Sequence, residues 1–331
     1  MRLIEQAWYR NHAIKWLLLP LSLLFWLLSS IRKWAFRIGL KKRVNVEVPV
    51  IIVGNIGVGG NGKTPVVIYL VDLLQQLGVQ VGVTSRGYGG TAESYPLNVD
   101  NNTTAEQAGD EPVLIYQRCQ VPTVVGADRV ANCQHLVAQG CQIIISDDGL
   151  QHYRLQRDLE IVIVDGQRRF GNGWLLPAGP LRELPARLQS VDAVICNGGV
   201  PAHGELQLTL QPGSLVHIQS GETISVQQFI NHYGANVQAL AGIGNPQRFF
   251  DTLRDLTFAV VEPTEFVDHH KFVVSDFAGF DSAIPLLMTE KDAVKCRDIC
   301  PDNAWYLPVE GVLSESDKQR LLHLINTRVL N

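Results

Sequence analysis

Acidic side chains are almost absent from the first 43 residues. This segment holds nine Lys and Arg residues but only Glu5 among acids, giving a net charge of +8. The remainder holds 19 of the 28 basic and 31 of the 32 acidic residues, giving −12 and an overall charge of −4. A basic head on an acidic body favours an anionic membrane surface as partner. Because the body has no basic patch with interleaved aromatic residues, we expect no nucleic-acid binding.

The chain also lacks the signatures of a zinc-binding or disulfide-stabilised protein. Its six cysteines form no C-x-x-C pair, which argues against a structural zinc site. Cys141 and Cys196 lie in apolar, strand-like surroundings, so we expect free, buried thiols in a reducing compartment. The chain has 331 residues, 46% of them hydrophobic, which is enough for two modest domains.

Residues 16–31 (WLLLPLSLLFWLLSSI) contain no charge. The run is short for a spanning helix, which needs about 20 apolar residues, and it contains Pro20. No small-residue cleavage site follows it, so a signal peptide is not indicated. Three basic residues precede the run and six follow it, which predicts a cytoplasmic body. We expect residues 1–43 to form a membrane-associated helix that enters one leaflet. A single span, or a helix packed on a soluble body, are the alternatives.

Residues 57–64 carry the strongest functional signal. They read GVGGNGKT, which matches the phosphate-binding P-loop pattern G-x-x-x-x-G-K-[ST]. A strand-like run at 48–53 precedes them and a helical apolar pattern follows Pro65, as such a loop requires. Lys63 is expected to reach the β- and γ-phosphates of ATP, and Thr64 to bind Mg²⁺. The predicted nucleotide-binding residues are Gly57, Val58, Gly59, Gly60, Asn61, Gly62, Lys63 and Thr64.

Apolar strand-like runs alternate with helical ones throughout the body. Strands are predicted at 48–53, 79–84, 121–125, 142–146, 159–164 and 191–196. Their Val/Ile-rich composition without alternation predicts a mostly parallel sheet with helices on both faces, an α/β fold of P-loop NTPase type. A helix is predicted at 128–139, with Asp128 as its cap.

The pattern changes after residue 204. Residues 205–236 have the short alternating runs of a β-ribbon, and an αβ rhythm resumes at Val237. We therefore predict a nucleotide-binding domain over 44–204. Residues 205–331 are predicted to form a second, smaller α/β domain joined through the ribbon.

A metal site is predicted where the run 142–146 leads into Asp147, Asp148 and Gly149. In P-loop enzymes, an aspartate at the end of a neighbouring strand holds Mg²⁺ directly or through water. The predicted ligands are Thr64 with Asp147 and Asp148, and which aspartate touches the metal stays open. An ordinary Asp-Gly turn is the alternative.

Eight short motifs follow one another along the chain. They are GGNGKTP (59–65), SRGYGG (85–90), GDEP (109–112), GADR (126–129), DDGLQH (147–152), FGNGWLLPAGPLRE (170–183), DHH (268–270) and TEKDAVK (289–295). In this order the chain resembles the tetraacyldisaccharide 4′-kinases, membrane-associated lipid kinases of the lipid A pathway. The resemblance extends from the hydrophobic N-terminus to about residue 295. It implies ATP-dependent phosphorylation of the 4′-hydroxyl of a tetraacylated glucosamine disaccharide 1-phosphate.

The resemblance also implies roles for individual residues. Asp110 of GDEP would take the proton of the acceptor hydroxyl, supported by His269 of DHH, with Lys63 on the nucleotide side. From the residues alone, a helix cap is the favoured interpretation of Asp110, because Pro112 follows it and an apolar run begins. His269 is equally a solvated loop residue.

Further residues are assigned to contact with the substrate or its phosphate. Arginine matches phosphate geometry bidentately, and the predicted contacts are Arg86, Tyr88, Arg129, His152, Arg182 and Glu183. Surface salt bridges are the alternative for each arginine.

The acceptor of such an enzyme is a lipid whose acyl chains are costly to extract into water. We therefore expect the protein at the cytoplasmic face of the inner membrane, with its site facing the bilayer and no obligate protein partner. One alternative is a membrane-targeted P-loop NTPase switch. Related switches often carry a lysine where this chain has Val58, which argues against that class. The other alternative is a soluble small-molecule kinase or ligase.

Overall fold

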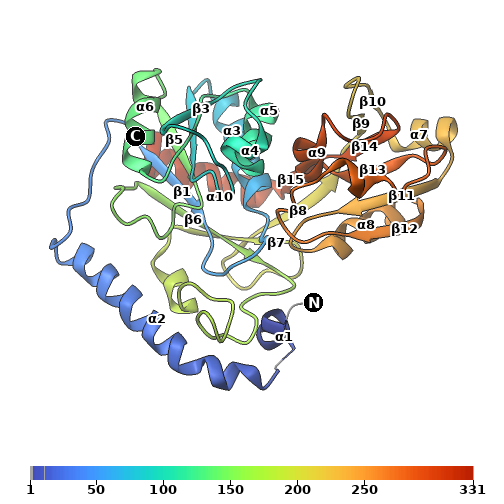
Figure 1. Ribbon diagram of the computed structural model, residues 1–331. Coiled ribbons are helices and arrows are strands. Elements are labelled where there is room, and N and C mark those ends of the chain that lie inside the picture. The colour runs from blue at the N-terminus through green and yellow to red at the C-terminus, as the bar shows by residue number, and fades with distance from the viewer. Residues whose placement is uncertain (1–2, 11, 331) are drawn as a thin grey trace.

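Two β-sheets organise the chain, one at each end of the view in Figure 1. The computed structural model describes residues 3–10 and 12–330. Arg2, counted above among the basic residues of the head, and Asn331, the end of the predicted smaller domain, lie outside the described residues.

The larger sheet has nine strands in the order β15-β8-β7-β6-β1-β5-β2-β4-β3. Strands β8 to β4 of this order run parallel, and only the edge strands β15 and β3 are antiparallel. The bounds are β1 (Val50–Gly54), β2 (Val81–Ser85), β3 (Leu97–Val99), β4 (Thr123–Val125), β5 (Ile143–Asp147), β6 (Leu159–Asp165), β7 (Ala193–Asn197), β8 (Leu206–Pro212) and β15 (Val309–Leu313).

Both faces of the larger sheet are buried, as its apolar strands predict. Ile51 and Val53 of β1 belong to a core formed with helices α3 (Lys63–Gln76), α5 (Asp110–Cys119) and α10 (Glu315–Ile325). Val50 and Ile52 belong to the opposite core, formed with α6 (Arg129–Ala138). The predicted cap of α6 is confirmed, because the Asp128 carboxylate accepts from Val130 N at 3.0 Å.

The smaller sheet has six strands in the order β10-β9-β14-β13-β11-β12. Its aromatic core contains Phe229, Phe250 and Trp305. The strands are β9 (Leu215–His217), β10 (Thr223–Ile224), β11 (Asn236–Ala241), β12 (Ala259–Glu265), β13 (Leu286–Thr289) and β14 (Ala304–Leu307). The helices of this unit are α7 (Val226–Tyr233), α8 (Pro246–Asp255) and α9 (Glu290–Cys296). The remaining short elements are α4 (Ala105–Ala108), η1 (Pro185–Ser190), η2 (Val274–Phe277) and η3 (Asn326–Leu330).

The chain passes between the two sheets twice. The sequence placed everything after residue 204 in the smaller domain, but β8, β15 and α10 belong to the larger sheet and its core. Strands β8 and β15 pair antiparallel from Leu208↔Leu313 to Pro212↔Val309. Strand β8, at the start of the predicted ribbon, is therefore one of two paired strands that connect the two units. The other is β15, which lies near the C-terminus of the chain. Helix α7 also lies within the predicted ribbon, and a capping box of Ser225 and Gln228 starts it.

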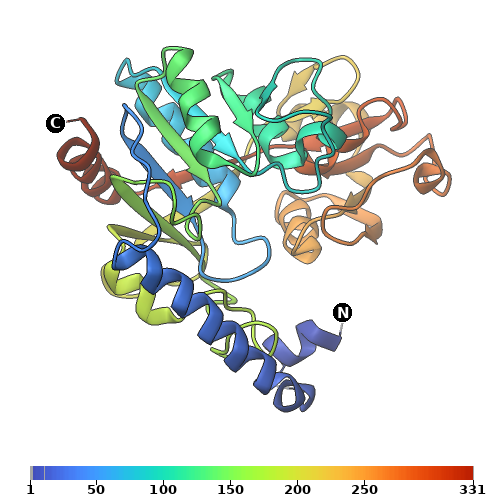
Figure 2. The ribbon, with the colours of Figure 1, turned by 60° about the vertical axis from the view of Figure 1, so that its left-hand side comes forward.

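An N-terminal helix lies against one side of the larger unit, after the short α1 (Leu3–Tyr9). Helix α2 (Ile14–Arg37) has 24 residues, continues through Pro20, and is long and apolar enough by length and composition to cross a membrane. Figure 2 shows it along the yellow-green loop of residues 165–187. Ser22 Oγ donates to Leu175 O and accepts from Ala178 N, both at 2.9 Å.

One stripe of α2 remains uncovered. Its members recur every three or four residues and are each about half exposed or more: Leu17, Leu21, Leu24, Leu28 and Ile31. A helix packed on a soluble body would bury this stripe.

The expectation of free thiols is confirmed, because all six cysteines are unpaired and buried.

Substituting Phe229 by alanine should destabilise the smaller unit by about 3–5 kcal/mol, because its fully buried ring packs edge-on against Trp305 at 5.3 Å. Urea unfolding followed by tryptophan fluorescence measures the loss. Val261→Ala, on the half-exposed surface of β12, is the control and should change stability by less than about 0.5 kcal/mol. Equal effects of the two substitutions would contradict the assigned core.

Candidate functional site

The predicted site residues gather at the carboxyl ends of the parallel strands, where open α/β sheets bind ligands. Strand β1 leads into the P-loop, and its neighbour β5 ends at Asp147, level with Val53. Strand β2 ends before Arg86, and β7 ends at Asn197. The sheet thus brings the glycine loop and the aspartates side by side.

The second half of the P-loop lines a cavity of about 240 Å³ between the two units. Gly62 caps α3 with φ 79°, and a Cβ there would collide with the amide of Asn197, which donates to Asn61 O at 3.1 Å. Only glycine fits this turn. The P-loop residues lining the cavity are Gly60, Asn61, Gly62, Lys63 and Thr64.

Gly57 and Val58 face the long loop of residues 165–187 instead of this cavity. Val58 N donates to Pro180 O at 2.9 Å, and Gly57 forms a bridge with Leu181. Gly59 has φ 99°. These first three positions shape the loop, and the last five face the space that a nucleotide would fill.

The two adjacent aspartates have different environments. Asp147 is fully buried, and Ser85 Oγ donates to its Oδ2 at 3.4 Å. Its Oδ1 has no hydrogen-bond partner within the described part of the chain. Burial, and next the charge of Glu111, raise the pKa of Asp147 above its ordinary value.

Asp148 already has cationic partners. Arg182 Nη1 lies 3.0 Å from its Oδ2, and Lys63 Nζ lies 3.6 Å from its Oδ1. Although burial opposes ionisation, these cations hold the pKa of Asp148 below its usual range. Asp147 therefore has the freer oxygen. Among residues 3–10 and 12–330, no three His, Cys, Asp or Glu side chains cluster as a metal site, so a cation here would need ligands such as Thr64 and the nucleotide.

Asp110 and His269 meet across the boundary between the units. His269 Nδ1 lies 2.9 Å from Asp110 Oδ2, and Asp110 is only 5% exposed. Asp110 is the first residue of α5, and Gly109 occupies the N-cap position. Asp110 is therefore not the helix cap. Burial raises the pKa of Asp110, but the hydrogen bond from His269 and the charge of Lys291 outweigh it and hold the pKa below its usual value.

His269 and His270 point to different partners. The hydrogen bond to Asp110 raises the pKa of His269, and the ring of Tyr88 lies 5.3 Å from that of His269. His270 pairs with Asp276 at 2.9 Å. The two rings therefore pair with separate carboxylates.

The three predicted arginines occupy different settings. Arg129 is buried and donates through Nη2 to Asp147 O at 2.6 Å, so it supports the end of β5. Burial lowers its pKa to about 10. Arg182 pairs with Asp148, and Arg86 is exposed at the end of β2. Only Arg86 and Arg182 are open to a ligand.

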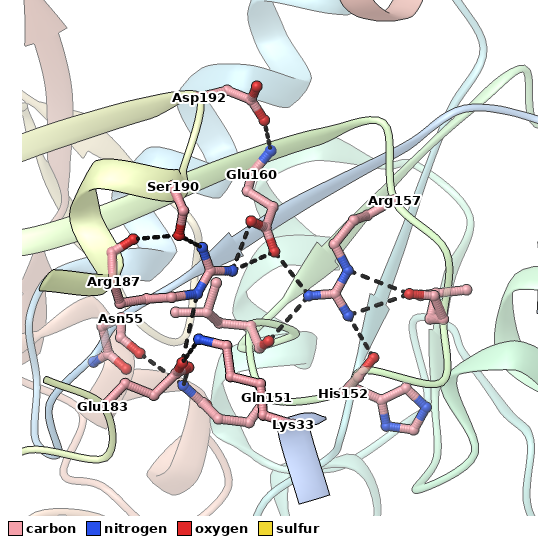
Figure 3. A network of polar contacts seen from close by, with 12 residues as sticks. Lys33, Asn55, Gln151, His152, Arg157, Glu160, Glu183, Arg187, Ser190 and Asp192 are labelled. Carbon is pink, nitrogen blue, oxygen red and sulfur yellow. Dashed lines mark hydrogen bonds and ion pairs between the residues drawn. The ribbon is translucent and has the colours of Figure 1, made fainter. Parts of the chain in front are cut away.

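Glu183 connects the site to α2 (Figure 3). It accepts from Lys33 Nζ at 3.1 Å and from Gln151 Nε2 at 3.0 Å. Gln151 also donates to Asn55 O, just before the P-loop, at 3.2 Å. His152 lies in the same motif, and burial lowers its pKa to about 4, so it is neutral near pH 7. A cavity of about 270 Å³ opens here between α2 and the loop and includes Arg182.

Comparison with known proteins identifies the family. The family described as tetraacyldisaccharide-1-P 4′-kinase matches residues 14–329. The tetraacyldisaccharide 4′-kinase of Colwellia psychrerythraea is 55% identical, covering 97% of this chain and 96% of its own. That of Pasteurella multocida is 52% identical, covering 92% and 93%. A crystal structure of LpxK from Aquifex aeolicus in complex with ATP is 29% identical, with a TM-score of 0.79, covering 96% of this chain and 99% of that one.

The chain belongs to the tetraacyldisaccharide-1-P 4′-kinase family. The resemblance drawn from the eight motifs and the predicted α/β fold are confirmed. Membership makes the chain a kinase of lipid A biosynthesis, and the P-loop cavity fits that class.

Several charged residues that line the P-loop cavity were not predicted. Three of them, Glu111, Asp268 and Lys291, form one charged cluster. Each lies inside a motif quoted for the resemblance: GDEP, DHH and TEKDAVK. The signal was therefore present, but nothing in the spacing showed that residues 111 and 291 meet.

Asp110→Asn should lower the pKa of His269, because the carboxylate that stabilises its charged form is lost. His152 should keep a pKa of about 4 in both proteins, since burial causes that shift. Histidine-selective NMR titration measures both. An unmoved His269 titration would contradict the pairing, and a His152 titration near its ordinary value would contradict its burial.

Proposed function

We propose that the protein transfers the γ-phosphate of ATP to the 4′-hydroxyl of a tetraacylated glucosamine disaccharide 1-phosphate, with Asp110 as the base. The observation that carries the proposal is the 2.9 Å hydrogen bond between Asp110 and His269. Both residues line a cavity of about 290 Å³, and their chain neighbours Glu111 and Asp268 line the P-loop cavity that contains Lys63. Relatives named as this kinase match nearly the whole chain.

The proposed step moves one proton and one phosphoryl group. Asp110 takes the proton of the acceptor hydroxyl. At the same time, the hydroxyl oxygen forms a bond to the γ-phosphorus of ATP. The bond between that phosphorus and the β,γ-bridging oxygen breaks, and ADP leaves. Lys63 neutralises charge on the phosphates. His269 holds the carboxylate, which is the role of an orienting partner in acid–base pairs.

Mg²⁺ is the proposed cation of the site. Asp147 has a buried carboxylate oxygen without a partner among the described residues, and oxygen ligands suit Mg²⁺. We assign Thr64 and Asp147 as its protein ligands, with Asp148 adjacent and oriented by Arg182 and Lys63. The ion would neutralise the phosphates during transfer.

The lipid acceptor is proposed to approach along α2. Arg182 and Lys33 line the cavity between α2 and the long loop, and Arg182 also reaches Asp148 at the nucleotide site. A phosphorylated headgroup in this cavity would meet the cations that match it. Arg86 and Tyr88, both exposed, are further proposed contacts, and the Tyr88 ring lies 5.3 Å from that of His269.

The proposed location is the cytoplasmic face of the inner membrane. The uncovered apolar stripe of α2 suits the acyl-chain boundary. Ser22, near the middle of α2, is bonded to the body loop through Leu175 and Ala178. If α2 crossed the bilayer along its normal, Leu175 and Ala178 would lie in the hydrocarbon core together with Ser22. This attachment favours a helix that enters one leaflet, which keeps the acceptor's acyl chains in lipid.

Asp110→Ala should reduce phosphate transfer by about 10²–10⁴-fold with little change in ATP affinity, because general-base catalysis is lost. Lys63→Ala is the contrasting variant and should weaken ATP binding itself. Initial rates with a lipid acceptor, and ATP binding by calorimetry, separate the two effects. If Asp110→Ala/His269→Ala is no slower than Asp110→Ala, the residues act as a unit. Retained turnover in Asp110→Ala would refute the base.

Leu24→Asp/Leu28→Asp should greatly reduce co-sedimentation of the protein with anionic vesicles. Both residues lie in the exposed stripe of α2, and burying a carboxylate at the acyl-chain boundary is unfavourable. Val200→Asp is the matched control, since Val200 is 82% exposed on the body, and should pellet like the unmodified protein. Equal pelleting of the double variant and the control would contradict the assigned membrane face.

A further inference from the structure

The motif TEKDAVK forms the turn from β13 into α9 in the smaller unit. Thr289 caps α9 by accepting from Asp292 N at 3.1 Å. The buried Asp292 accepts from Gly242 N at 2.9 Å and from Thr289 Oγ1 at 2.6 Å, and Lys295 Nζ lies 2.7 Å from it. These contacts fix the first turn of α9, and so fix the direction in which residue 291 leaves it.

Lys291 leaves this rigid turn toward the larger unit and reaches three carboxylates. Its Nζ lies 3.1 Å from Glu111 Oε1 and 3.7 Å from both Asp110 Oδ2 and Asp268 Oδ1. The side chain is 17% exposed. Burial opposes the charge of Lys291, but the surrounding carboxylates outweigh it and keep the pKa of Lys291 above its ordinary value, which places a positive charge beside the proposed base.

We propose that Lys291 is a positioning residue that holds the Asp110 carboxylate ionised and aimed at the acceptor hydroxyl. The inference rests on the proposed function of Asp110. The inference also assigns a role to the motif TEKDAVK. The motif places the ammonium group of Lys291, on the smaller unit, beside Asp110 on the larger unit.

The charge balance of the site shows why a cation is needed there. Asp110, Glu111 and Asp268 all approach Lys291, and carboxylates this close raise one another's pKa when no cation separates them. Without Lys291, Asp110 would keep the ring of His269 at 2.9 Å and the backbone N–H of Glu111 at 2.8 Å, but would lose the ammonium group that lies 3.7 Å from its Oδ2. Truncating one partner of a buried ion pair leaves an uncompensated charge, which here is the group that must accept a proton.

Docking of α9 does not require Lys291. The neighbouring Glu290 already pairs with Arg118 of α5 through both carboxylate oxygens, at 3.0 and 3.1 Å. This pair joins the same two helices but does not touch Asp110. Substitution of Arg118 is therefore a matched control. It weakens the contact between α5 and α9 without removing the positive charge beside Asp110.

Several charged groups set the titration of the Asp110–His269 pair. They are Asp268 on the loop after β12, Lys291 and Lys295 on α9, and Glu111 on α5. The hydrogen bond to Asp110 raises the pKa of His269, whereas Lys291 lowers it. Loss of the ammonium should therefore move the His269 titration to higher pH, and the acid limb of the kcat profile as well.

The test compares Lys291→Met, Lys291→Arg and Arg118→Met in the full-length protein. Lys291→Met should lower kcat roughly tenfold or more with a smaller change in KM for ATP. It should also raise the His269 pKa by NMR titration. Lys291→Arg keeps the charge and should restore the His269 titration. Arg118→Met should leave that titration unmoved.

Each contrary result has a defined meaning. An unchanged kcat and His269 titration in Lys291→Met would overturn the inference. A large rise in KM for ATP with an unmoved titration would also overturn it, because Lys291 would then act on the nucleotide. If Lys291→Met does not fold, Glu111→Gln replaces it. Removing that competing carboxylate should move the His269 titration to lower pH, and no shift would overturn the inference.

A parallel measurement on Asp110→Asn separates this inference from the proposed function. Full activity in Asp110→Asn would refute Asp110 as the base, and with it any role for Lys291 through Asp110. An inactive Asp110→Asn, together with a fully active Lys291→Met, would refute only the role of Lys291.

Discussion

The contact between α5 and the smaller unit is the constraint on which the site depends. Asp110 begins α5 on the larger unit, and its partner His269 lies 159 positions further along the chain on the smaller one. Lys291, also from the smaller unit, places its ammonium group 3.7 Å from the Asp110 carboxylate. The cavity lined by the P-loop lies between the same two units. Asp110, the proposed base, therefore has these two side-chain partners only when the units are in contact.

The path of the chain supports this contact. Because β8 and β15 pair within the larger sheet, the smaller unit is attached through two strands and not through one flexible linker. Arg168 of the long loop adds a bond across the boundary, donating to Gly244 O at 2.8 Å. On the other side of the site, Glu183 joins Lys33 of α2 to the DDGLQH motif. The proposed lipid entry and the nucleotide loop are thus connected through a few side chains.

Much of this was predictable from sequence because the signals are local. The P-loop pattern, the strand ending at Asp147 and the Asp128 cap each depend on residues adjacent in the chain, and the structure contains all three. The family resemblance supplied Asp110 with His269, which no local pattern joins. The return of β15 to the larger sheet was not predicted, because strand pairing between residues 208 and 313 leaves no local trace. Lys291 was missed for the same reason.

Transfer of phosphate from ATP to a lipid is the reaction that we propose for this site. The most direct measurement follows the label of γ-³²P-ATP after incubation with an acylated glucosamine disaccharide 1-phosphate in detergent micelles, with products separated by thin-layer chromatography. We expect a new, more polar labelled lipid whose formation needs Mg²⁺. Labelled free phosphate alone, with no labelled lipid, would contradict it and favour a nucleotide-hydrolysing switch.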